Sequence, residues 1–157
     1  MPTCARSISR AQARVYWAGE VPQWFDLARE FTERWVHYQQ IREAAPPGEH
    51  NHQQDEYLPL VLRTFIWGFP HQYQAPAPGG TAIALEIPGI GAWTLTRTAT
   101  GWSLDEGQPA APAASLRITR EAAWRLLTGT RYDARQVQLS GDPALAEPLL
   151  RVRGIIV

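Results

Sequence analysis

The stretch from Val21 to Ala44 constrains this chain more than any other, because it contains no helix-breaking residue after its second position. Pro22 suits the first helical position, where a missing N–H leaves no helical hydrogen bond unmade. Pro46-Pro47-Gly48 then ends the run. The sequence therefore predicts one long helix over Val21–Ala44.

Two faces are expected on this helix when its residues are placed at 100° per position. Because Glu33 and His37 are four residues apart, both side chains could reach one metal ion, whereas a zinc site needs at least three ligands. Glu30 could complete a weak carboxylate-rich site, and the competing interpretation is a solvated surface pair. One face is an aromatic stripe of Trp24, Leu27, Ala28, Phe31, Trp35 and Tyr38, and the other carries Asp26, Glu30, Glu33, His37 and Ile41.

The segment from Phe25 to Arg42 resembles the last bundle helix of mycothiol-dependent maleylpyruvate isomerase-like proteins, which are DinB-like metal-binding four-helix bundles. The later part of the chain, through Ser140-Gly141-Asp142-Pro143, resembles the C-terminal α/β domain of that family. The likeness covers nearly all of this chain but only part of a typical family member.

The resemblance implies a metalloenzyme with an incomplete metal site. Family members hold a divalent ion, most often zinc, with a histidine from an earlier helix and a Glu-x-x-x-His pair, which Glu33 and His37 match. They isomerise a maleyl double bond with a low-molecular-weight thiol as cosubstrate. Residues 1–20 are too few to supply three helices and the earlier histidine, so activity of this chain alone is left uncertain.

Two arginines are candidates for binding substrate carboxylates. Arg131 and Arg135 precede a predicted strand at Val137, and a planar guanidinium suits a carboxylate. The competing interpretation is that both are ordinary surface arginines.

Charge and composition exclude several classes of partner. Fifteen basic and fifteen acidic residues leave no formal net charge, so nothing favours nucleic acid or an anionic membrane surface. The single cysteine, Cys4, excludes a disulfide framework, and the loop histidines His50 and His52 have no fixed carboxylate or cysteine beside them. Without a signal peptide or a membrane-length apolar run, a cytoplasmic protein is expected.

The rest of the chain predicts an α+β fold. An apolar face at helical spacing predicts a second helix over Asp55–Tyr73, with Pro59 in its first turn. From Thr81 the period changes to two, which predicts an antiparallel meander followed by a further helix with Thr119 as N-cap. Asp142 is expected to cap a closing helix that Pro148 kinks or shortens. Strands are expected around Ile83–Ile87, Trp93–Leu95, Trp102–Leu104, Ser115–Ile118 and Val137–Leu139.

Two functional hypotheses follow from this organisation. Residues 1–45 are expected to be a tail plus the last helix of a truncated metal-binding bundle, and residues 46–157 a sterol-carrier-like α/β domain. The first hypothesis is a thiol-dependent metalloenzyme of small-molecule substrates, with a homodimer pairing two long helices around one ion. The alternative is a non-catalytic binding or interaction module whose sheet-and-helix sandwich could hold an apolar ligand.

Overall fold

The computed structural model describes residues 12–15, 19–45 and 56–154, and the predictions for Cys4, His50 and His52 lie outside them. The helices are α1 (Gln23–Ala44), α2 (Leu58–Ile66), α3 (Phe69–Gln72), α4 (Arg120–Leu127) and α5 (Pro143–Ala146), with 3₁₀ helices η2 (Ala134–Gln136) and η3 (Glu147–Arg151). The strands are β1 (Gln12–Val15), β2 (Gly19–Pro22), β3 (Ala82–Ile87), β4 (Gly91–Arg97), β5 (Trp102–Glu106), β6 (Ala114–Ile118) and β7 (Val137–Gly141).

A five-stranded sheet with the order β5-β4-β3-β6-β7 forms the C-terminal part of the fold. The predicted meander is confirmed, because β3 pairs with β4 and β4 with β5 in antiparallel fashion. β6 and β7 are also antiparallel, whereas β3 and β6 run parallel. The mostly exposed loop after β5 carries the chain across to the far side of β3, which makes that pairing parallel.

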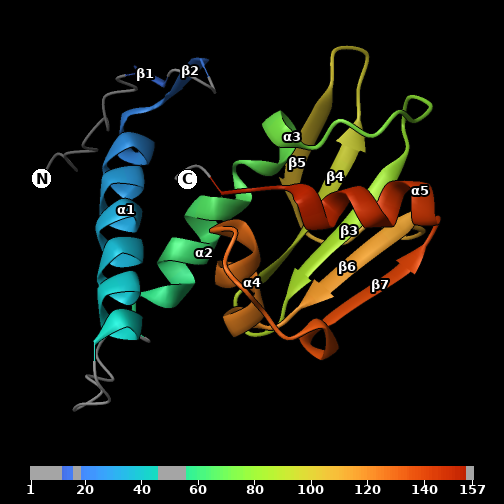
Figure 1. Cartoon of the computed structure of the whole chain (residues 1–157). Coiled ribbons are helices and arrows are strands. Elements are labelled where there is room, and N and C mark those ends of the chain that lie inside the picture. Colours follow the sequence, from blue (N-terminus) through green and yellow to red (C-terminus); the bar gives the residue numbers. More distant parts are fainter. Residues whose placement is uncertain (1–11, 16–18, 46–55, 155–157) are drawn as a thin grey trace, which may run out of the picture.

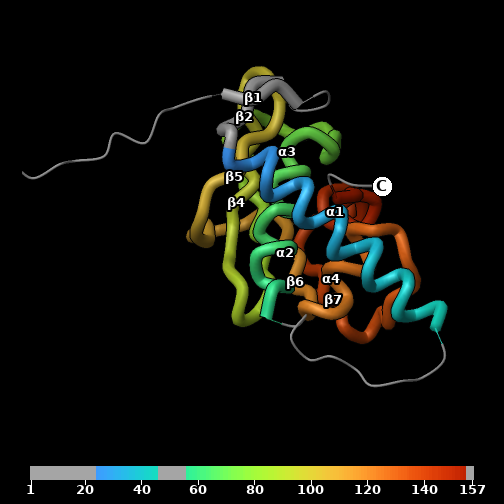
Figure 2. Tube along the Cα trace, turned by 90° about the vertical axis from the view of Figure 1, so that its left-hand side faces the viewer, coloured from blue at the N-terminus to red at the C-terminus, as the bar shows by residue number. Residues whose placement is uncertain are grey.

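Helices cover one face of this sheet and leave α1 as an outer layer. Figure 1 shows α2 and α4 between α1 and the sheet, and in Figure 2 α1 passes in front of them. One cluster of buried side chains runs through the layers, from Trp35 and Val36 of α1 through Phe65 of α2 to Leu85 and Leu116 of the sheet. The fold is therefore of the predicted α+β class, while a domain boundary at residue 45 stays a prediction.

The chain before α1 differs from what the sequence predicts. The sequence predicts a tail followed by a helix that starts at Val21, but Gln12–Val15 and Gly19–Pro22 pair as two antiparallel strands, β1 and β2. Pro22 ends β2, and α1 begins one residue later, at Gln23. Proline fixes only its own φ and removes one donor, so it fits the end of an edge strand as well as a helix start.

The helix predicted over Asp55–Tyr73 is divided into two. α2 ends at Ile66, and α3 starts at Phe69 after Gly68. Gly68 and Pro70 explain the break, because glycine weakens a helix interior and Pro70 has no N–H to donate to the Ile66 carbonyl, so the i→i−4 ladder cannot continue. Pro59 lies in the first turn of α2, as expected.

The predicted caps of the two later helices are confirmed. The Thr119 side chain accepts a hydrogen bond from the Ala122 amide at 3.2 Å, and Asp142 accepts one from the Ala144 amide at 2.9 Å. The last helical segment changes to 3₁₀ geometry at Glu147, the residue before Pro148. These local signals therefore fixed where α4 and α5 begin and where α5 ends.

Candidate interaction face

α1 has three faces rather than the two that its sequence predicts. The buried face comprises Phe25, Thr32, Trp35, Val36 and Gln39. It packs against α2 and α4, with the Trp35 and Trp124 rings in an edge-to-face contact at 5.7 Å. The aromatic stripe that the sequence predicts is therefore only partly buried, and Trp35 is the member of it that enters the core.

An exposed apolar stripe lies beside the buried face. We call it the α1 stripe. In the single chain Leu27 is 71% exposed, Ile41 67% and Trp24 52%. Their spacing alternates between three and four residues, which is the a/d repeat by which helices pair. The stripe consists of Trp24, Leu27, Phe31, Arg34, Tyr38 and Ile41.

Three further exposed side chains, from α2 and the two residues that flank it, widen this stripe. Trp67 contacts Trp24 edge to face at 5.7 Å, and Tyr57 contacts Phe31 in the same way at 5.4 Å. We call the surface formed by the α1 stripe together with Tyr57, Leu60 and Trp67 the α1–α2 face. Among residues 24–45 and 56–154, every large hydrophobic side chain that is exposed belongs to this face. Such concentration on one side is typical of an interaction surface.

The third face of α1 is acidic and carries the predicted metal ligands. His37 Nε2 lies 4.0 Å from a carboxylate oxygen of Glu33, and His37 Nδ1 lies 3.1 Å from the side-chain oxygen of Gln40. The Arg29 guanidinium pairs with Glu30 at 2.5 Å and approaches Glu33 at 3.6 Å. The charge of Glu30 and Glu33 is thus already partly balanced within the helix.

These residues do not by themselves fit a zinc site. In the described part of the chain, no three His, Cys, Asp or Glu side chains are grouped so that they could hold a metal ion. Glu33 and His37 supply two donors, Glu30 faces Arg29, and a third ligand would have to come from elsewhere. Metal binding by Glu33 and His37 therefore stays a prediction.

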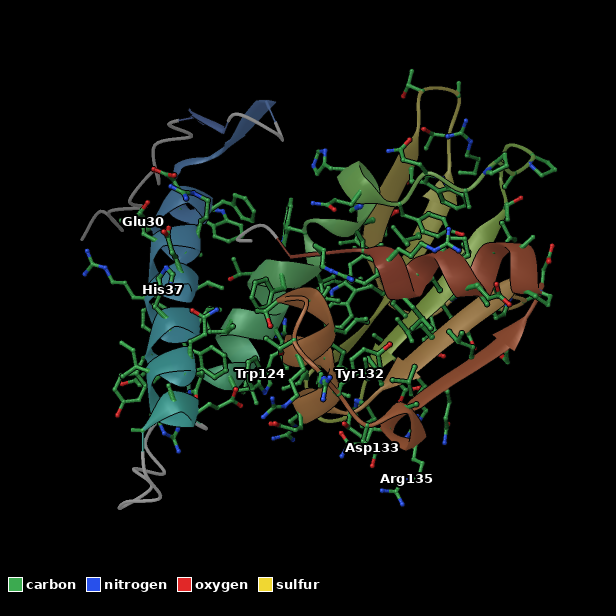
Figure 3. The ribbon with its side chains drawn as sticks, in the orientation of Figure 1. Glu30, His37, Trp124, Tyr132, Asp133 and Arg135 are labelled. Carbon is green, nitrogen blue, oxygen red and sulfur yellow. The ribbon has the colours of Figure 1, made fainter. Side chains whose placement is uncertain are left out.

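Of the two candidate substrate arginines, Arg135 lies away from this pair (Figure 3). Figure 3 shows Arg135 near the opposite end of the molecule from Glu30 and His37. Arg135 is 90% exposed and donates to Asp133 at 2.7 Å. Hydrogen bonding to Arg135 lowers the pKa of the Asp133 carboxyl, and the same contact raises the pKa of Arg135. Arg131 is exposed as well. Among the described residues, the ion pairs of Glu33 are with Arg29 and His37, and that of Arg135 is with Asp133.

A small cleft lies between α1 and α4, which the sequence did not predict. The α1–α4 cleft has a volume of about 260 Å³ and is lined in part by Trp35 and Trp124. Arg125 lies over the Trp124 ring at 4.5 Å and donates to Glu43 and Glu121 at 2.5 and 2.6 Å. Burial works to lower the pKa of Arg125, but its hydrogen bonds to both carboxylates raise it overall. Arg42 also lines the cleft, so two guanidinium groups and two carboxylates leave its lining without net charge, and no excess charge selects an ionic ligand.

The space between the sheet and the helices is filled by side chains. A void lined by Phe69, Leu85, Leu116 and Leu126, among others, has a volume of about 10 Å³. That is close to the minimum for one water molecule. The apolar ligand that the sequence-based alternative places inside the sandwich therefore has no room at this position.

Comparisons with known proteins give likenesses of fold only. No protein-family model matches the sequence, and no curated protein matches it. A solved structure described as a UbiJ-SCP2 ubiquinone synthesis protein is similar over 60% of this chain and 94% of its own, with 10% identity and a TM-score of 0.40. Sterol carrier protein 2 like 2 from Aedes aegypti is similar over 62% of this chain and 91% of its own, with 20% identity and a TM-score of 0.37. For sterol carrier protein domain 2 of Helicoverpa armigera the shares are 66% and 91%, with 13% identity and a TM-score of 0.38.

Likenesses at this level carry no conclusion about ligand, activity or family. The resemblance to the mycothiol-dependent family and the thiol and zinc that it implies therefore stay predictions. Among the described residues, no helix combines the length and the apolar character needed to cross a membrane. The α1–α2 face is the feature of the structure that bears most directly on function.

Proposed function

We propose that this chain is a non-catalytic interaction module that forms a homodimer through the α1–α2 face. One observation carries the proposal: the exposed large hydrophobic side chains of the described residues all lie on this face. Each large apolar side chain that becomes fully buried contributes about 1.5–3 kcal/mol, so covering several of them favours association strongly.

A second copy of the chain is the occupant that the α1 stripe fits best. A stripe with a/d spacing pairs with another stripe of the same spacing, and a second copy supplies one with the same length and composition. The acidic side chains Glu30 and Glu33 stand outside the stripe, so pairing does not bury them. The apolar residues on α2 extend the surface that a partner helix would cover.

The proposal is tested by measuring the mass of the protein in solution over a range of concentrations. Sedimentation equilibrium of the full chain is expected to give a mass of about 35 kDa, twice the 17.6 kDa of one chain. Leu27→Glu and Ile41→Glu place a charge in the stripe and should shift the mass to that of a monomer. Both residues are largely exposed in the single chain, so neither change should disturb its fold.

Gln138→Glu is the matched control, because it adds the same charge at an exposed position on β7, away from α1. It should leave the mass unchanged, and circular dichroism should show the same helix content for all variants. A monomer at every concentration would contradict the proposal. So would a dimer that both stripe variants leave intact.

A further inference from the structure

We infer that the two copies pair their α1 helices in antiparallel orientation, about a midpoint between Thr32 and Glu33. This inference rests on the proposed homodimer and adds the geometry of its interface. The stripe positions lie at equal distances on either side of that midpoint. Antiparallel pairing therefore sets Trp24 against the partner's Ile41, Leu27 against the partner's Tyr38, and Phe31 against the partner's Arg34.

Arg34 decides between the two possible orientations. It is the one charged member of the α1 stripe, and it is exposed. In a parallel pair with the helices in register, each Arg34 would face the partner's Arg34, which brings two like charges together. In the antiparallel pair, Arg34 faces the ring of the partner's Phe31, a contact that is attractive for a guanidinium.

The edge of the α1 stripe that faces away from α2 gives a second argument for the same orientation. Glu30 and His37 both lie along that edge, which continues into the acidic face. Antiparallel pairing brings Glu30 to within one helical turn of the partner's His37, and the two-fold axis repeats the contact. A carboxylate then meets an imidazole that can donate a hydrogen bond to it. In a parallel pair these two edges lie on opposite sides of the interface, so this contact does not form.

Mixed disulfide cross-linking tests the orientation. The background is Cys4→Ser, which removes the only native cysteine. One preparation then carries Leu27→Cys and another Tyr38→Cys. Under mild oxidation the mixture is expected to shift from 17.6 kDa to about 35 kDa on a non-reducing gel, whereas each preparation alone is expected to remain at 17.6 kDa.

The control mixture combines Leu27→Cys with Gln138→Cys, and it should not cross-link. Cross-linking of Leu27→Cys with itself, and of Tyr38→Cys with itself, would indicate a parallel pair and overturn the inference. The mass of each sample in solution is measured in parallel. A dimer without the mixed cross-link overturns the orientation but leaves the homodimer standing, whereas a monomer overturns both.

A charge swap tests the edge contact without cysteines. His37→Glu should weaken the dimer about two- to five-fold, as expected for loss of an exposed pair and the approach of two carboxylates. Adding Glu30→Arg to the same chain should restore the wild-type dissociation constant. Equal dissociation constants for all three proteins, or a double variant weaker than the single one, would contradict the Glu30 contact with the partner's His37.

Discussion

Gly141, at the end of β7, is a position where only glycine fits. Its φ of 82° lies in the left-handed region, and a Cβ there would stand 2.7 Å from the Cα of Ala114 in the neighbouring strand. Both the backbone conformation and the close approach exclude a side chain. The turn from β7 into α5 therefore depends on this residue.

We predict that Gly141→Ala lowers the free energy of unfolding by about 2 kcal/mol or more, because strain and a clash with strand β6 add together. Urea denaturation monitored by circular dichroism measures the loss. Gly79→Ala is the control, since nothing lies within 4 Å of a Cβ at Gly79 and its φ is not positive. Equal unfolding midpoints for Gly141→Ala and the wild type would show that this account of β7 is wrong.

Tyr73 is a buried phenol whose ionisation links stability to pH. Its hydroxyl donates to the Leu145 carbonyl at 2.7 Å, and its ring contacts Trp102 at 4.8 Å. Burial, and secondly the negative charge of Asp142, raise the pKa of Tyr73 to about 12. In the unfolded chain a tyrosine has a pKa of about 10. Above pH 10 the unfolded state thus loses a proton that the folded state keeps.

We predict that stability falls as the pH rises from 10 to 12, by up to about 3 kcal/mol, because the folded-state pKa lies above the unfolded one. Tyr73→Phe should remove most of this slope. At pH 8 it should also lower the free energy of unfolding by about 1 kcal/mol, through loss of the hydrogen bond. Urea titrations at several pH values give both quantities. The exposed Tyr57→Phe should keep the wild-type slope, and the same slope in Tyr73→Phe would count against this assignment.

At the scale of the elements, α1 is joined to the rest of the fold by few side chains for its length. The buried residues lie on one side of its 22 positions, and Trp35 is the largest of them. Trp35 packs against Trp124 of α4, while Arg125 of α4 reaches Glu43 near the end of α1. Docking of α1 therefore depends on its buried side chains, of which Trp35 is the largest, more than on the ion pair, because an exposed ion pair adds little.

We predict that Trp35→Ala lowers the free energy of unfolding by about 3–5 kcal/mol and loosens α1 more than the sheet. Hydrogen exchange followed by mass spectrometry should show faster exchange in α1 peptides, with β3 and β4 still protected. Gln40→Ala serves as the control, since Gln40 is exposed on α1 and lies outside the α1 stripe, and it should change exchange in α1 much less. A uniform rise in exchange across α1 and the sheet would argue that α1 is not a separately loosened element.

At the scale of the whole molecule, the described residues place a broad apolar surface on the outside of the fold and a small void between the sheet and the helices. The void between the sheet and the helices is about 10 Å³, whereas the α1–α2 face presents apolar residues to solvent. A protein built in this way would bind a partner on its surface more readily than it would enclose a lipid chain.

We predict that the protein does not enclose a fatty acid. Native mass spectrometry after incubation with palmitate should show no adduct in Leu27→Glu, in which the exposed face carries a charge. Any adduct of the wild-type chain should thus be lost in that variant, because it would be held on the α1–α2 face. A one-to-one palmitate adduct that persists in Leu27→Glu would show that the interior opens to hold it.

Short-range patterns in the sequence were enough to predict most elements. The apolar and polar alternation from Ile83 onward predicted β3 and β4, because a strand with one buried face repeats every two residues. Thr119 and Asp142 predicted the starts of α4 and α5, because an N-cap bonds to an amide two or three positions away. Each of these signals depends on atoms that are close in the chain. The break between α2 and α3 was missed although Gly68 and Pro70 were visible there.

What only the tertiary structure decided is which surfaces meet. The sequence places apolar residues around much of α1, and two stripes compete for burial. Contact with α2 and α4 selects the side with Phe25 and Val36 and leaves Leu27 and Ile41 exposed. The parallel pairing of β3 with β6 and the α1–α4 cleft likewise depend on residues far apart in sequence. The sequence by itself determined most of the helices and strands and the caps of α4 and α5, because those follow from local geometry. Long-range packing alone decided which face of α1 remained free for a partner.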